Sequence, residues 1–201
     1  MSRPMDMEKR RELALSALEV LREHGLQQAT MSGIAKALEI KRPTLYFYFP
    51  SIPDLFVALV EILREDELAW VAERMQGHAH PIDALGVFLR AEHAFVVERG
   101  LDDVMLLMTS FWASGSREHR ERFRSLVLKD LLPARSMFIG LLQHGIASNL
   151  VHPCDVEAVV DLIFSIQDGI LVQGGVRDLD VEPLFALVED TVLAPLKVNA
   201  A

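Results

Sequence analysis

Five residues between positions 41 and 48 combine charge, hydroxyl groups and aromatic rings in a way that suits nucleic-acid binding. They are Lys41, Arg42, Thr44, Tyr46 and Tyr48. Each carries a donor that can reach a phosphate oxygen or a base edge. Lysine and arginine are also the side chains that commonly read guanine in the major groove. We therefore predict that Lys41 and Arg42 contact guanine edges or phosphates, and that the two tyrosines donate to phosphates.

The residues before this segment predict a helix that would position it. Apolar side chains recur there at the spacing of one helix face, and Thr30 stands before them as an N-cap. These apolar residues are Met31, Ile34, Ala35 and Leu38. A second short helix is expected at about 42–49. Two short helices joined by a tight turn are typical of a helix-turn-helix, whose second helix enters the DNA major groove.

A third helix is expected to begin at Ser51. Ser51-Ile-Pro-Asp54 forms a capping box, in which the Ser51 hydroxyl accepts from the amide of Asp54 and the carboxylate reaches back. Backbone amides at such a helix start also bind phosphate. The predicted DNA-binding residues are therefore Thr30, Lys41, Arg42, Thr44, Tyr46, Tyr48 and Ser51.

Nearly every other segment has helical periodicity, and no stretch alternates like a strand over a useful length. The sequence thus predicts an all-α protein. Gly25 and Gly145 are expected to end helices, and Pro133 is expected to kink its helix or split it in two. The expected helices lie at about 7–24, 31–38, 42–49, 51–75, 82–99, 102–112, 117–144, 155–173 and 181–193.

Composition narrows the class of protein. The chain has 201 residues, 51% of them apolar, which is enough for one or two domains with a core. It carries a net charge of −9, yet residues 1–50 hold eight Lys or Arg against six acids. An acidic remainder is compatible with DNA binding because only the surface that faces phosphates must be basic. The sequence has a single cysteine, no apolar leader and no long apolar run. We therefore expect a cytoplasmic chain without a membrane partner.

With these residues in view, the chain resembles the TetR (AcrR-like) family of bacterial transcriptional regulators. The resemblance is carried by the helix ending at Gly25, by T30-M-S-G-I-A-K-A-L38, by T44-L-Y-F-Y-F-P50 and by Ser51. It implies that Leu45 and Phe49 are core residues, while Thr44, Tyr46 and Tyr48 face DNA. It also implies a DNA-binding helix-turn-helix domain at 1–50 and a helical domain for ligand binding and dimerisation at 51–201.

Four positions depart from the family pattern. Glu39 stands where the turn usually has glycine, so it must adopt the turn's backbone without glycine's freedom. Lys41 replaces a small hydroxyl residue at the cap of the second helix, and Pro43 replaces a common glycine. Ile52 replaces a lysine that touches phosphate, a contact that Ser51 and backbone amides would have to supply.

The resemblance further implies that the second domain binds an effector. Soft methionines and aromatic rings suit an adaptable apolar pocket, although for any single one of these residues an ordinary helical core is the favoured interpretation. The predicted pocket residues are Trp70, Phe88, His93, Phe95, Met105, Met108, Phe111, Trp112, Phe138, Phe164 and Gln167. His93, Gln167 and His144 are the polar candidates for anchoring a small apolar effector. No cofactor is expected.

The two carboxyl-terminal helices, at about 155–173 and 181–193, are expected to form a homodimer, as the resemblance implies. A palindromic double-stranded DNA operator requires a two-fold protein, so dimerisation and DNA reading are linked. Burial of these helices within one subunit is the alternative.

The function predicted is therefore a ligand-responsive DNA-binding regulator, most often a repressor in such families. A helical-bundle enzyme or carrier for an apolar molecule is the first alternative, and a regulator that responds to a protein partner is the second. We predict no catalytic residues, because no nucleophile elbow, phosphate-binding glycine loop or HExxH motif is present. His78 with His80, and His152 with Cys154, are weak metal pairs without a second pair nearby, so we predict no metal site.

Overall fold

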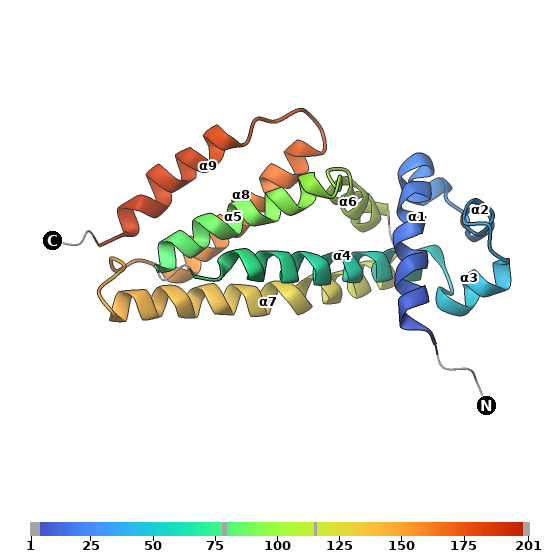
Figure 1. Cartoon of the computed structure of the whole chain (residues 1–201), viewed down its shortest axis with the longest axis horizontal. Coiled ribbons are helices and arrows are strands. Elements are labelled where there is room, and N and C mark those ends of the chain that lie inside the picture. The colour runs from blue at the N-terminus through green and yellow to red at the C-terminus, as the bar shows by residue number, and fades with distance from the viewer. Residues whose placement is uncertain (1–4, 78–79, 115, 199–201) are drawn as a thin grey trace. The chain divides into compact units, whose positions relative to one another are not determined.

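The computed structural model describes residues 5–77, 80–114 and 116–198. In these ranges the chain is helical, without a strand, and one isolated antiparallel bridge joins Val151 to Lys197. The predicted all-α class is confirmed (Figure 1). The elements are α1 (Met7–Gln28), α2 (Met31–Ala37), α3 (Arg42–Tyr48), α4 (Ile52–Met75), α5 (Pro81–Glu98), α6 (Val104–Ser114), α7 (Arg117–Ala147), α8 (Val156–Gly174), α9 (Glu182–Val188), a π-helix (Glu189–Leu193) and a 3₁₀ turn (Ala194–Leu196).

The chain folds as two compact units. The first comprises Met1–Asp66 and Leu107–Val127, and the second comprises Glu67–Leu106 and Leu128–Ala201. All three boundaries between the units fall inside helices, so α4, α6 and α7 each contribute residues to both units. The functional division at residue 50 stays a prediction, and the two units are described separately.

In the first unit, side-chain caps begin the first two helices. Asp6 caps α1 by accepting from the amide of Lys9 at 3.0 Å, and Thr30 caps α2 by accepting from the amide of Gly33 at 3.0 Å. Gly25 interrupts α1 with φ +70°, as predicted for a helix end, although one more helical turn follows it. The inner faces of these helices are buried; they include Leu13, Ala14, Ala17, Leu18, Leu21, Ile34 and Ala35.

The turn between α2 and α3 closes without glycine. Glu39 has φ +53°, in the left-handed region that glycine enters most easily. Its amide donates to the carbonyl of Lys36 at 3.1 Å, and the amide of Ile40 donates to the carbonyl of Ala35 at 3.0 Å. The prediction that Glu39 adopts the turn's backbone is confirmed, and its conformation stores local strain.

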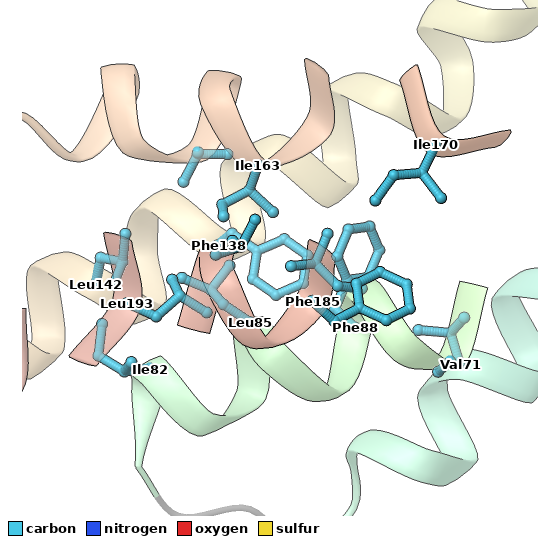
Figure 2. Close-up of a cluster of buried hydrophobic side chains, with 14 of the residues drawn as sticks. Val71, Ile82, Leu85, Phe88, Phe138, Leu142, Ile163, Ile170, Phe185 and Leu193 are labelled. Atoms are coloured by element: carbon cyan, nitrogen blue, oxygen red, sulfur yellow. The ribbon is translucent and has the colours of Figure 1, made fainter. Parts of the chain in front are cut away.

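In the second unit, an apolar cluster fills the space between α5, α8, α9 and the parts of α4 and α7 that belong to this unit (Figure 2). The rings of Phe88 and Phe138, which belong to the cluster, meet that of Phe164, which is partly buried against it, with centroids 4.7 to 6.1 Å apart. Offset and edge contacts of this kind add to the stabilisation that burial provides. Ile163 and Ile170 point from α8 into the cluster that holds the rings of Phe88 and Phe138 (Figure 2).

Helix α7 is longer than expected. Of the two effects expected of Pro133, the split does not occur, because Pro133 lies inside one continuous helix. Gly145 does not end it either: α7 continues to Ala147, and Asn149 takes the left-handed conformation with φ +56°. Gly145 is instead a close-packing position, since a Cβ there would lie 2.6 Å from Val151 Cγ2 and 2.9 Å from Pro81 Cγ.

The last predicted helix also differs from the structure. It begins at Glu182 as expected but becomes a π-helix at Glu189, a form that is uncommon and short where it occurs. Arg90 of α5 forms ion pairs with Glu182 and Glu189, and Lys197 pairs with Asp83. These ion pairs connect the residues from α9 to the carboxyl-terminal end of the described chain with α5.

In the part of the chain that the structure describes, no single helix is long and apolar enough to cross a membrane. One bent pair, α3 with α4 at 59°, reaches the required length and composition together.

Candidate nucleic-acid interface and effector site

Helix α3 separates an inner apolar edge from an exposed polar one. Leu45 and Phe49 are fully buried, as predicted for core residues. Lys41, Arg42, Thr44 and Tyr46 are exposed, and Tyr48 is partly buried. The pattern follows from the helical period, which turns Leu45 inward and leaves its neighbours on the outer surface.

The two cations at the start of α3, Lys41 at its N-cap and Arg42 in its first turn, have no acidic partner that would neutralise their charge within the ranges that the structure describes. The Arg42 guanidinium lies 5.9 Å from the ring centroid of Tyr46, a cation–π distance. This contact aligns two predicted DNA-binding side chains on one surface, and both retain donors that can bind a phosphate.

Thr30 and Ser51 are already engaged within the protein. The Thr30 oxygen accepts from Gly33, which leaves its O–H proton able to donate outward. The Ser51 hydroxyl accepts from the Asp54 amide at 3.3 Å and donates to the Asp54 carboxylate at 2.6 Å. The predicted cap is confirmed, and a phosphate at this helix start would bind through backbone amides more readily than through the Ser51 hydroxyl.

Two features of this surface were missed from the sequence. Phe47 is 46% exposed on α3, with its ring edge-on to Tyr48 at 5.1 Å, so an apolar ring belongs to the outer surface of the helix. Arg122 donates to Asp54 at 2.6 Å and joins α7 to the capping box of α4. The run of aromatic residues Tyr46-Phe47-Tyr48 was a usable signal for the first feature. No local pattern connects residues 68 positions apart.

Comparisons with known proteins agree with this geometry. Residues 15–59, which include the whole of α2 and α3, match the family model for bacterial regulatory proteins of the tetR family. The chain is 24% identical over 201 residues to the HTH-type transcriptional regulator BetI of Rhizobium meliloti (strain 1021), covering 97% of this chain and 93% of that protein. The chain carries the amino-terminal domain of the TetR family. It is therefore a DNA-binding transcriptional regulator, as predicted.

Solved structures share the TetR-family fold over nearly the whole chain. The regulator FadR from Bacillus subtilis, in complex with stearoyl-CoA, has a TM-score of 0.74 at 20% identity and covers 92% of this chain and 98% of its own. The TetR-family regulator PfmR from Thermus thermophilus has a TM-score of 0.70 at 17% identity and covers 90% of this chain and 97% of its own. These similarities extend the shared fold through the second unit.

The predicted pocket residues divide between the two units. Met108, Phe111 and Trp112 belong to the first unit, where the Phe111 ring meets Phe56 at 4.9 Å and Phe123 at 5.5 Å. The other eight belong to the second unit, and their rings form two groups there. Phe88, Phe138 and Phe164 form the central cluster, while Trp70 lies edge-on to Phe95 at 6.1 Å and stacks on the Arg74 guanidinium at 3.2 Å.

Three predicted residues of the second unit carry buried polar atoms without hydrogen bonds. In the part of the chain that the structure describes, Trp70 Nε1, His93 Nδ1 and both amide atoms of Gln167 have no partner. Each such buried group costs about 1–3 kcal/mol if it stays unsatisfied. Burial lowers the pKa of His93, partly opposed by the charges of Asp102 and Glu182, and its ring lies 5.7 Å from that of Phe185. His144, the other polar candidate, is exposed on α7.

The weak metal pairs gain no support as sites. His78 lies outside the described residues. His80 caps α5 by accepting from the Ile82 amide at 3.2 Å, and its Nε2 lies 3.2 Å from the carbonyl oxygen of Leu150. Burial raises the pKa of the Cys154 thiol, and the charge of Asp155 raises it further. No group of three or more potential ligands occurs among the residues described.

Proposed function

We propose that this regulator binds a palindromic operator as a homodimer and releases it when an apolar effector binds to the second unit. The observation that carries the effector half is the buried, unpartnered amide of Gln167, which lies on α8 between Ile163 and Ile170 of the apolar cluster. Ligand sites in proteins commonly combine apolar walls with a few such polar groups. The structural relative FadR was solved with stearoyl-CoA, which makes long apolar chains the first class to test.

DNA contact is assigned to the exposed surface of α3 and the adjoining helix starts. The side chains that would bind the major groove and its phosphates are those of Lys41, Arg42, Thr44, Tyr46 and Tyr48. Thr30 and the backbone at Ser51 would contact DNA at the edges of this surface. The missing acidic partners of Lys41 and Arg42 among the described residues support this assignment, because phosphate would supply the opposite charge.

The dimer is assigned to α8 and α9. Leu162 of α8 is 45% exposed and Leu187 of α9 is 58% exposed. A groove of about 450 Å³ lies between these helices, lined in part by Ile166, Ile170 and Leu184. Exposed apolar side chains beside an apolar groove suit an isologous interface, in which one patch meets its own copy.

The regulatory proposal is tested by titrating stearoyl-CoA, and separately palmitate, against a fluorescent operator duplex bound to the full chain. Operator affinity should fall about five- to 150-fold at saturating effector, which is the usual range of allosteric coupling. Unchanged affinity with both compounds would contradict an effector of the long-chain acyl class.

A further inference from the structure

Gln167 has a hydrogen-bonding capacity that the chain itself does not use. The side chain is 1% exposed, and neither Oε1 nor Nε2 has a partner among the described residues. A carboxamide offers two N–H donors and one oxygen acceptor. Buried polar groups in native proteins are nearly always paired, so a molecule other than this chain is expected to complete the hydrogen bonds of Gln167.

The position of Gln167 on α8 shows where that molecule would lie. Ile163 is four residues before Gln167 and Ile170 three residues after it, so all three share one face of the helix. Both isoleucines point into the cluster around the rings of Phe88 and Phe138 (Figure 2). The amide of Gln167 therefore faces the same apolar interior.

We propose that the effector presents an uncharged hydrogen-bonding group, such as a carboxamide or a hydroxyl, to the amide of Gln167, and an apolar body to the surrounding cluster. This inference rests on the proposed function, because it assumes that the effector lies within the second unit. It adds the chemical class of the group that is recognised.

The chemistry around Gln167 favours an uncharged group over an ion. A carboxamide is neutral, so it would leave a buried ionic ligand without a compensating charge. The cluster that Gln167 faces consists of apolar side chains. A carboxamide or hydroxyl ligand both donates and accepts, and so it can engage Oε1 and Nε2 together.

Three probes with the same chain length test this inference: dodecanamide, 1-dodecanol and sodium dodecanoate at pH 8. Their affinities for the full-length protein are measured by displacement of Nile red, followed by fluorescence. Wild type should bind the amide and the alcohol about tenfold more tightly than the carboxylate, because hydrogen bonds to Gln167 add to the shared burial of the chain. Gln167→Leu should weaken amide and alcohol binding about tenfold and leave carboxylate binding unchanged.

Two further variants keep the test specific. Gln167→Met also removes the amide at similar size, so it replaces Gln167→Leu if that variant fails to fold. Gln173→Leu makes the same change at an exposed position of the same helix and should retain the wild-type preference. The thermal midpoint of Gln167→Leu should equal or exceed that of wild type, because an unpartnered buried polar group is replaced by an apolar one.

The inference is overturned if wild type shows no preference for the uncharged probes, if none of the three binds, or if Gln167→Leu retains the preference. Operator binding of the same samples without probe distinguishes this failure from failure of the proposed function. Intact operator binding without the preference contradicts the role of Gln167 alone, whereas loss of specific operator binding in wild type contradicts the proposed function.

Discussion

The Arg122 guanidinium donates to the Asp54 carboxylate at 2.6 Å, and the same carboxylate accepts the Ser51 hydroxyl at 2.6 Å. This connects the first turns of α7 to the start of α4, just after Tyr48 ends α3. Residues far apart in the chain thus hold the start of α4, which follows α3 closely in the sequence.

Arg122→Gln is therefore expected to weaken operator binding without removing a DNA contact. The Arg122 side chain is 45% exposed, so the loss should be modest, about two- to fivefold in Kd. Fluorescence anisotropy with a labelled operator measures it. Arg117→Gln is the matched control, since Arg117 forms an exposed pair with Glu121 on the same helix. If both variants raise the Kd for the operator equally, the proposed role of Arg122 is contradicted.

Arg42→Ala and Tyr46→Ala are expected to weaken DNA binding directly. Arg42→Ala should cost about 1–3 kcal/mol if Arg42 reads a base, or lower the salt dependence of binding by about one counterion if it contacts phosphate. Tyr46→Ala removes an uncharged donor, so it should weaken binding without changing the salt dependence. Binding isotherms at several salt concentrations separate the two cases. Arg135→Ala, in the second unit, serves as a control, and wild-type isotherms for Arg42→Ala would contradict the assigned DNA-binding surface.

Glu39→Gly is expected to stabilise the protein. Its φ of +53° is costly for a residue with a side chain and cheap for glycine, so the free energy of unfolding should rise by about 1 kcal/mol. Glu12→Gly, in the interior of α1, should instead lower it by about 1 kcal/mol. Denaturant titrations of both variants give the comparison. A less stable Glu39→Gly protein would show that the turn is not strained.

Leu162→Glu and Leu187→Glu are expected to break the proposed dimer. Both side chains are exposed in the single chain, so a charge there is harmless to the fold but costly inside an apolar interface. Sedimentation should show monomers with an unchanged circular dichroism spectrum. Val97→Glu, equally exposed on α5, should remain dimeric. Dimers of wild-type affinity in both interface variants would place the interface elsewhere.

Stability should fall as the pH is lowered from about 7.5 to 5.5, in part through His93. Burial lowers the pKa of His93 in the folded chain below its ordinary value. The unfolded chain therefore takes up the proton first, and folding loses free energy as the pH falls through this window. His93→Gln should show a smaller decrease in thermal midpoint across these pH values. An identical decrease in both proteins would contradict this account of His93.

Regular, local features were predictable from the sequence. The apolar spacing of Met31, Ile34 and Ala35 and the caps at Thr30 and Ser51 depend on residues within a few positions of one another, and these predictions are confirmed. The resemblance of the 44–50 segment correctly indicated the burial of Leu45 and Phe49.

Features that depend on distant packing were not predictable. Gly145 has the residue type of a helix end, but its lack of a side chain is used for close packing against Val151 and Pro81. A π-helix begins at Glu189, and the Glu189 carboxylate pairs with Arg90, which lies 99 positions earlier in the chain. Met105 and Met108 belong to different units. This division depends on contacts between distant residues, which the helical periodicity of the sequence does not reveal.

Selection of bound duplexes from a random DNA pool is the most direct test of operator reading by a dimer. The full-length protein should enrich an inverted repeat whose half-sites lie a whole number of helical turns apart, about 10 base pairs or a multiple of it. Arg42→Ala should enrich the same repeat poorly or not at all. A pool without sequence enrichment, or an enriched site without two-fold symmetry, would contradict the central claim.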